Sequence, residues 1–554
     1  MRTLRPLSLL AALSLTLGCQ DTLGAPSTDA GSVAPTDNGA APTDAQGLSP
    51  DAAPGDAGDP LATENAPLTY TPEGCMHRVR SLPGTINNVL GNRTVFGPMP
   101  EPRNVHTSWP AEPSTTIAIA WQTDNQTRAS VVQLGTSPTM LDQTAVGSVS
   151  TGGTGNTEVT IHEAHLCGLR PDTTYHYRVG GEGHWSAVQR FKTAPAPGRT
   201  DYDVNFVVSG DSRDNFTTWR QVQERVVMGA QQPDFQIFSG DAVLLGTLQG
   251  AWQQWFTGAA ASQAVMPWMM AHGNHDALAI NYLLQFAQPQ VDAPEQSELY
   301  FSFDYGPVHF LFLNDTPLRD DYAGNVAGTQ LTWMRADLTR ARANRARVPF
   351  IVAVHHKPCF ASSRHSSTTD TVFIRTTWAP VFDEFGVDLV LNGHEHDFEL
   401  SKDLDGRGQE VSGRRGTRYI VAAGAGAQLY ELQDGMPRSW SAYYESVVNF
   451  LRVHATMTRL EVTPFRLDGT IIERGRVSSL PARCDPRQRG AVGRGLRSTP
   501  PVPPKQTSPR CGGASAPGPI SRGADRRRLR GRQRRAVHRL HAGVALLWQD
   551  DRTR

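Results

Sequence analysis

No apolar run in the 554-residue sequence is long enough to cross a bilayer, which takes about 20 apolar residues. The apolar stretch at residues 7–18 is too short, and it follows the charged residues Arg2 and Arg5. This absence excludes a membrane-spanning helix. The short stretch after a basic start instead predicts a cleaved export signal.

The end of this stretch, TLGC, resembles a bacterial lipoprotein signal, although Thr16 stands where leucine is usual. We expect residues 1–19 to be a lipoprotein-type signal, with Cys19 as a lipid anchor in the bacterial cell envelope (outer membrane or periplasm). The alternative is an ordinary signal cleaved nearby, which leaves Cys19 unmodified and the protein secreted.

Cysteine is scarce. The six cysteines are Cys19, Cys75, Cys167, Cys359, Cys484 and Cys511. An exported chain permits disulfides, but spacing alone does not define the pairs. Cys75 and Cys484 flank the predicted folded region, and their pairing is our working hypothesis.

The net charge of the sequence is zero, but the positive and negative charges are unevenly distributed between the C-terminal part and the rest of the chain. From Pro481 onward, 18 Lys and Arg face four Asp, a net charge of +14, which leaves residues 1–480 at −14. Residues 481–554 are rich in Arg, Gly, Pro and Ser and predict a basic disordered tail. A basic arm for polyanions or membrane surfaces is the alternative, and no specific nucleic-acid partner is predicted.

The N-terminal part predicts a tether and then an all-β domain. Residues 20–66 are rich in Ala, Pro and Asp with almost no aromatics, which indicates a disordered tether, and residues 67–103 form a lead-in segment. Residues 104–196 hold short alternating runs such as TTIAIAWQT and TTYHYRV, which predict an antiparallel sandwich with Trp121 in its core.

The stretch LRPDTTYHYRV resembles the corner of a fibronectin type III domain. The corner residues are Leu169, Pro171, Thr173 and Tyr175. Three histidines fall in these predicted strands, His162, His165 and His176. We expect them to be packed or solvated rather than to bind a metal.

Residues 201–476 alternate between apolar strands and helical stretches such as GTQLTWMRADLTRARANRA, which predicts an α/β domain. Residues 300–315 have the pattern of two strands joined at Gly306-Pro307, so the sheets flanked by the helices are expected to be mixed.

Five polar loop motifs occur in this domain, and four directly follow an apolar run. They are SGDSR (209–213), SGDAV (239–243), HGNHD (272–276), VHHKP (354–358) and NGHEH (392–396). Asp, Asn and His are donors that suit Fe, Mn or Zn. A shared carboxylate with ligands on either side holds two ions about 3.5–4 Å apart, an arrangement used on phosphate esters.

This motif set resembles that of the calcineurin-like metallophosphoesterases. The preceding sandwich, with QLTWMRADL and GHEHDFE, narrows the resemblance to the purple acid phosphatases over residues 104–470. The resemblance implies that Asp241 bridges two divalent or trivalent ions. It also implies one ion on Asp211 and His396, and another on Asn274, His394 and either His355, our choice because it directly follows the apolar run, or His356.

The resemblance also implies residues that act on the substrate. His275 resembles the group that stabilises the transferring phosphoryl and protonates the leaving oxygen. Asp276 either orients the His275 imidazole or faces solvent. His365, in the loop SSRHSS, resembles a further substrate-contacting histidine, with simple exposure as the alternative.

Two positions depart from the family. Arg213 stands where most metallophosphoesterases have a histidine ligand, and Leu244 stands where purple acid phosphatases have a tyrosinate. The first metal site is therefore expected to be weak, and the purple colour absent. Arg213 clamps a phosphate oxygen beside a water-filled site, or replaces the weak ion, or merely pairs with Asp211 or Asp214.

The expected function is that of an exported metal-dependent phosphoesterase. It hydrolyses a small phosphomonoester, as acid phosphatases do, through a hydroxide that bridges the two ions. One alternative is a phosphodiesterase for nucleotides or lipid head groups. Another is a surface binding protein with a vestigial metal site.

Overall fold

The computed structural model describes residues 68–82, 85–228, 232–276, 279–290, 298–316, 322–412 and 414–483. The predicted signal, the tether, most of the basic tail, Cys19, Cys484 and Cys511 lie outside these residues. Within the described ranges, no helix has the length and apolarity needed to span a membrane.

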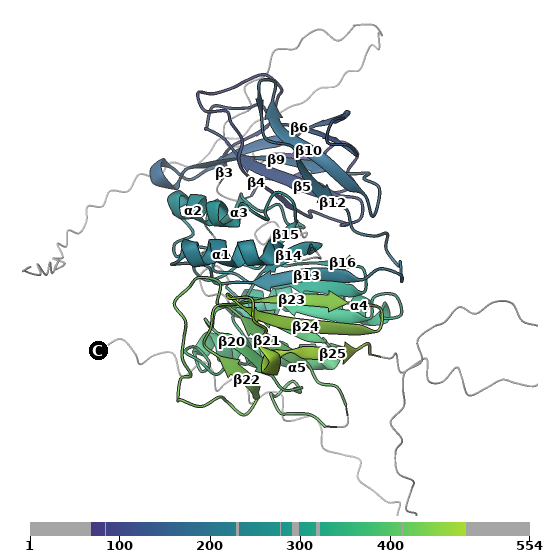
Figure 1. Cartoon of the computed structure of the whole chain (residues 1–554), viewed down its shortest axis with the longest axis vertical. Coiled ribbons are helices and arrows are strands. Elements are labelled where there is room, and N and C mark those ends of the chain that lie inside the picture. Colours follow the sequence, from purple (N-terminus) through teal and green to yellow (C-terminus); the bar gives the residue numbers. More distant parts are fainter. Residues whose placement is uncertain are drawn as a thin grey trace, which may run out of the picture. The chain divides into compact units, whose positions relative to one another are not determined.

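The N-terminal part is an all-β domain, as predicted (Figure 1). One sheet has the order β3 (Thr85–Leu90), β8 (Ser148–Gly152), β9 (Val159–Leu166), β5 (Ile117–Gln122) and β4 (Arg103–Ser108), all antiparallel. The other has β11 (His184–Trp185), β10 (Thr174–Gly181), β6 (Val131–Gly135) and β7 (Gln143–Val146), with β12 (Gln189–Lys192) also on β10. The 3-10 turn η1 (Gly155–Thr157) joins β8 to β9.

Aromatic side chains fill the core of this domain. Trp121 is fully buried and stacks on His162, whose Nε2 lies 2.7 Å from Thr123 Oγ1. The Tyr175 hydroxyl accepts a hydrogen bond of 3.0 Å from the backbone of Arg170, which fastens the corner before β10. His162 is thus a packed residue that has a polar partner.

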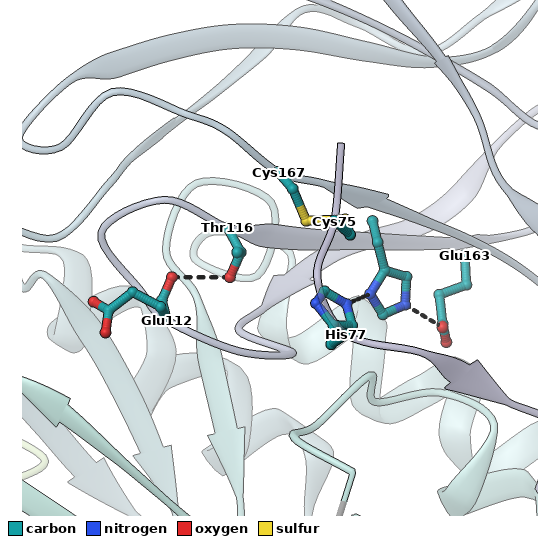
Figure 2. Close-up of a disulfide and its surroundings, with 7 residues drawn as sticks. Cys75, His77, Glu112, Thr116, Glu163 and Cys167 are labelled. Atoms are coloured by element: carbon teal, nitrogen blue, oxygen red, sulfur yellow. Dashed lines mark hydrogen bonds and ion pairs between the residues drawn. A yellow bond between two sulfur atoms is a disulfide. The ribbon is translucent and has the colours of Figure 1, made fainter. Parts of the chain in front are cut away.

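A disulfide joins Cys75, between the short strands β1 (Thr69–Tyr70) and β2 (Val79–Arg80), to Cys167 at the end of β9 (Figure 2). The expected Cys75–Cys484 pairing is therefore wrong. The two sulfurs are adjacent because the lead-in segment folds back onto β9, a long-range contact that spacing does not reveal. Beside the disulfide, His77 Nε2 lies 3.0 Å from His165 Nδ1, and His165 Nε2 lies 2.6 Å from Glu163 (Figure 2).

The following domain is α/β with two mixed sheets, as predicted. The first has the order β15 (Trp268–Met270), β14 (Phe235–Phe238), β13 (Val204–Ser209), β23 (Asn449–Ala455), β24 (Arg459–Arg466) and β25 (Val477–Pro481). The second has β16 (Phe301–Tyr305), β17 (Val308–Phe312), β18 (Phe350–Val354), β19 (Leu389–Asn392), β21 (Arg418–Ala422), β20 (Phe398–Ser401) and β22 (Ser441–Glu445).

Helices cover these sheets. They are α1 (Phe216–Val227), α2 (Gln249–Ala259), α3 (Ile280–Leu283), the π-helical turn η4 (Tyr322–Thr329), α4 (Gln330–Ala343), α5 (Thr369–Phe385) and the 3-10 turn η5 (Glu473–Gly475). Asn215 caps the N-terminus of helix α1, because its side chain accepts a hydrogen bond from the Thr218 N–H. Its buried residues recur at helical spacing, and Trp219 among them packs on Phe238 of β14 and Trp255 of α2.

The β-domain shares one core with both sheets of the α/β domain. Trp109, which follows β4 and is fully buried, contacts Phe235, Phe303 and Tyr305 of the α/β domain. The Tyr177 hydroxyl also donates a hydrogen bond of 2.7 Å to the carbonyl of Ala264. These contacts bury aromatic surface from both domains in a continuous cluster.

Five strands of the two sheets have their carboxyl ends on the same side of the α/β domain. Strands β13, β14 and β15 run parallel, and so do β18 and β19. Each is followed by one of the five polar motifs. Because the carboxyl ends of parallel strands meet at one edge, the fold gathers these motifs into a single site.

Candidate metal centre

Four donor atoms converge where β14, β15, β18 and β19 end. The Nε2 atom of His356 lies 3.1 Å from Asn274 Oδ1, 3.3 Å from His394 Nδ1 and 3.3 Å from Asp241 Oδ1. Ligands of one tetrahedral ion with bonds of about 2.1 Å lie about 3.4 Å apart. These residues therefore fit one metal ion, which we call the His356 site.

Neighbouring groups determine which nitrogen of His356 carries a proton and how strongly the imidazole holds it. Its Nδ1 lies 2.9 Å from the carbonyl of Ser239, to which it donates, so that Nε2 points its lone pair at the His356 site. Burial lowers the pKa of His356, but the nearby carboxylates of Asp241, Asp211 and Asp315 together outweigh burial and raise it to about 10. An ion bound at this site takes the place of that proton.

The structure corrects our choice between the two neighbouring histidines. His355 is fully buried on the other side of the chain, with Nδ1 2.9 Å from Asp315 Oδ2 and its ring against Trp378 of α5. Successive side chains of an extended segment point to opposite faces, so only His356 faces the other ligands. The preference for His355 as the ligand is wrong, and the alternative His356 is the residue at the site.

A second group of possible ligands shares Asp241 and adds Asp211 and His396. We call it the His396 site. His396 Nε2 lies 3.5 Å from Asp211 Oδ1, and His396 Nδ1 lies 2.6 Å from the carbonyl of Gln428, to which it donates. The lone pair of Nε2 is thereby turned toward the carboxylates.

The guanidinium of Arg213 lies inside the His396 site. Its Nη2 is 3.2 Å from His396 Nε2, its Nε is 3.4 Å from Asp241 Oδ2, and its Nη1 is 3.2 Å from Asp214 Oδ2. The side chain is 11% exposed, so this is a nearly dry contact. The Leu244 side chain is about half exposed and brings no donor in place of a tyrosinate.

Backbone conformation holds the ligands close together. Asp211, Asp241 and His394 have φ angles of 57°, 58° and 72°, a left-handed conformation that is uncommon outside glycine and typical of functional sites. A Cβ on Gly273 would overlap Asp241, and one on Gly393 would overlap Oδ2 of Asp211. Glycine at these two positions lets the ligand loops approach each other.

His275 stands beside the ligands with a defined orientation. Its Nδ1 lies 2.9 Å from the carbonyl of Leu244, its backbone N–H donates to Asp241 Oδ1, and its Nε2 is 4.0 Å from Asp241 Oδ2. The side chain is 30% exposed, so Nε2 is open to a bound substrate.

Asp276 has a different partner from the one expected. Its buried carboxylate accepts hydrogen bonds of 2.9–3.0 Å from the backbone N–H groups of Asp241, Ala242 and Gly273, and no described contact joins it to the His275 imidazole. It therefore fixes the metal-binding loops rather than His275, and it does not face solvent. Burial raises the pKa of Asp276 to about 7.

His365 lies at the rim of the site. Its ring is 4.4 Å from the ring of His394 and its backbone N–H donates to Glu395, with the side chain about one quarter exposed. This position is compatible with the predicted substrate contact.

Several residues of the site lie outside the five sequence motifs and were not predicted. Tyr430 stacks on His396 with 4.0 Å between ring centres, and the exposed Arg364 lies over the Tyr430 ring, 5.1 Å from its centre. Asp315 anchors His355 and the backbone of Lys357. The position of Asp315 at the end of an apolar strand, as in the other motifs, is a signal that could have identified it.

Comparisons with known proteins agree with this geometry. Residues 102–193 match the family described as purple acid phosphatase, N-terminal domain, and residues 204–398 match calcineurin-like phosphoesterase. Residues 204–398 thus form a domain of the calcineurin-like phosphoesterase type, a family of hydrolases that act on phosphate esters. More narrowly, the chain has the domain pair of the purple acid phosphatases, as the sequence resemblance indicated.

Relatives cover both domains. Acid phosphatase type 7 of Homo sapiens is 26% identical over 409 residues, 68% of this chain and 90% of the relative. Purple acid phosphatase 18 of Arabidopsis thaliana is 27% identical over 311 residues, 55% of this chain and 66% of the relative. The solved purple acid phosphatase of yellow lupin (Lupinus luteus) shares the fold, with a TM-score of 0.57 and 18% identity over 70% of this chain and 75% of that one.

Proposed function

We propose that the protein is an acid phosphatase-like enzyme that hydrolyses small phosphomonoesters. The observation that carries this proposal is His275, whose Nε2 faces the ligand cluster at 4.0 Å from Asp241 while its Nδ1 is fixed by the Leu244 carbonyl. An ion held by Asp241, Asn274, His356 and His394 supplies positive charge for phosphate oxygens and acidifies water at the site.

The remaining steps belong to side chains of this chain. With Nδ1–H donated to Leu244, His275 Nε2 is the nitrogen that carries a proton to the leaving oxygen. Arg213 adds a buried cation beside Asp241, and Arg364 adds an exposed one at the rim. Two guanidinium groups suit the dianionic phosphate of a monoester better than the monoanion of a diester.

The choice between monoester and diester is tested with p-nitrophenyl phosphate and bis(p-nitrophenyl) phosphate on the metal-loaded protein. We expect kcat/KM to favour the monoester by about tenfold or more, which is about 1.4 kcal/mol in activation free energy. Faster turnover of the diester would replace the proposal with a phosphodiesterase. Turnover of neither ester would favour a binding protein with a vestigial site.

The role of His275 has a separate test. Replacing it, His275→Asn, should lower kcat on phenyl phosphate by about 100-fold or more, and lower it much less on p-nitrophenyl phosphate, whose leaving group needs no proton. Bound metal should not change, because His275 is not a ligand. His184→Asn, a half-buried histidine on β11, is the control and should leave kcat unchanged. Equal losses on both esters would contradict the acid role.

The protein is also proposed to be exported and held in the cell envelope through Cys19. Two features support this. The signal-like residues 1–19 precede a tether-like composition, and the disulfide between Cys75 and Cys167 is typical of oxidising compartments. Mass spectrometry of the mature N-terminus after expression in a bacterial host tests it. An unmodified Cys19 in a released protein would leave secretion as the outcome.

A further inference from the structure

The His396 site already contains a positive charge. Arg213 Nη2 lies 3.2 Å from the Nε2 atom of His396, and Arg213 Nε forms an ion pair of 3.4 Å with Asp241 Oδ2. These two acceptor atoms are the same ones that an ion shared with Asp211 would need. The guanidinium therefore competes directly with a metal ion for the site.

The imidazole of His396 has only one lone pair to offer. Its Nδ1–H donates to the carbonyl of Gln428 at 2.6 Å, which fixes the tautomer and leaves Nε2 as the acceptor. Tyr430 stacks on the ring and limits its rotation. A hydrogen bond from Arg213 and a bond to an ion cannot use this lone pair together.

Arg213 is also held in place rather than loosely inserted. Asp214, itself in a left-handed conformation with φ of 80°, contacts Arg213 Nη1 at 3.2 Å from the outer side. The Arg213 backbone N–H donates to the carbonyl of Asp241. The side chain is nearly buried, and the guanidinium of arginine stays charged in proteins.

Electrostatics decides between the guanidinium and a second ion. A cation and a divalent ion a few ångströms apart in a nearly dry site repel each other by several kcal/mol even at an effective dielectric constant of about 20. Asp211 and Asp241 supply two negative charges. One ion at the His356 site and the positive charge of Arg213 together offset both, so no negative charge remains to hold a second ion.

We propose that this enzyme binds one catalytic metal ion, at the His356 site, and that Arg213 takes the place of the second ion at the His396 site. The guanidinium forms an ion pair with Asp241 and offers its planar N–H groups to a phosphate oxygen. This inference concerns metal content, so it stands or falls separately from the choice of substrate.

The experiment counts metal ions per chain. The full-length protein is stripped with a chelator, loaded with Mn²⁺, passed over a desalting column and analysed for bound Mn. We expect about one ion per chain in the wild type and about two in Arg213→His, because histidine removes the competing charge and adds a ligand nitrogen. Electron paramagnetic resonance should show an isolated Mn²⁺ in the wild type and a coupled pair in the variant.

A matched control is Arg364→His, which changes an exposed arginine at the rim and should keep about one ion. Circular dichroism on all three proteins checks that they are folded. Two tightly bound ions in the wild type would overturn the proposal. One ion in both the wild type and a folded Arg213→His would also overturn it, because Arg213 would then not be what keeps the second ion out.

Discussion

Two neighbouring histidines have opposite roles in this protein. His356 points its Nε2 at Asp241, Asn274 and His394, whereas the Nδ1–H of His355 donates to Asp315 inside the core. Both are fully buried, so burial does not distinguish them. What distinguishes them is the alternation of side chains at the end of β18.

The first prediction separates these roles by substitution. His356→Ala should lower metal affinity by more than about 100-fold. Even the loss of a residue that only hydrogen-bonds to a metal ligand lowers metal affinity about 10–100-fold. His355→Ala should keep the ion but lower the free energy of unfolding by about 2–4 kcal/mol, because it leaves a cavity and a buried Asp315 without its partner. Metal titration and chemical denaturation measure the two effects. Loss of metal in His355→Ala would contradict the assignment.

At the scale of elements, one histidine links two strands and a helix. His309 on β17 lies 2.6 Å from Asp304 on β16 and 2.8 Å from Asp337 on α4. Both ring nitrogens donate to carboxylates, which requires the charged imidazolium. Burial lowers the pKa of His309, but the two aspartates outweigh burial and raise it to about 9.

The second prediction is a stability change with pH. Because the folded pKa is above the unfolded value of about 6.5, this histidine stabilises the fold fully below pH ~6.5 and loses that effect as pH rises through about 9. The loss should be about 2–4 kcal/mol. Denaturation of wild type and His309→Gln at pH 6 and pH 9.5 should show a large difference between the two proteins at pH 6 and a small one at pH 9.5. An equal difference at both pH values would contradict the charged link.

At the scale of the whole molecule, the disulfide closes a long loop. Cys75 and Cys167 are separated by 92 residues, so their bond constrains most of the β-domain in the unfolded chain. In the chain-entropy account, cross-linking a loop of this length limits the unfolded ensemble strongly.

The third prediction concerns this bond. Replacing both cysteines with serine should lower the free energy of unfolding by about 2–5 kcal/mol. The ligands of the His356 site lie in the other domain, so metal content should not change. Adding a dithiol reductant should destabilise the wild type by a similar amount and leave the double variant unaffected. A variant as stable as the wild type would show that the bond contributes nothing.

Much of the fold and site follows from local sequence patterns. The alternating runs predict the β-domain, and the apolar runs that end in SGDSR, SGDAV, HGNHD and NGHEH predict strands whose loops carry the ligands. The predicted strands and loops agree with the structure because each pattern depends only on one strand and the loop that follows it.

The parts that the sequence does not predict depend on contacts between distant segments. The partner of Cys75 is set by how the lead-in segment folds onto β9, and the environment of Asp276 by backbone groups of two other loops. Tyr430 lies in an irregular segment after β21 and carries no motif, so only the tertiary structure shows that it stacks on His396. Arg213 is an anomaly in the sequence, and only the structure shows that it contacts His396, Asp241 and Asp214.

From the aromatic cluster around Trp109 we expect the two domains to resist mechanical force together. Trp109 of the β-domain is wedged against Phe235, Phe303 and Tyr305, so the seam between the domains is part of the core rather than a hinge. A chain pulled from its two ends in an optical trap must break this cluster before either domain can move away from the other. The force trace should therefore show one large rupture for both domains, where two loosely joined domains would give two smaller ones.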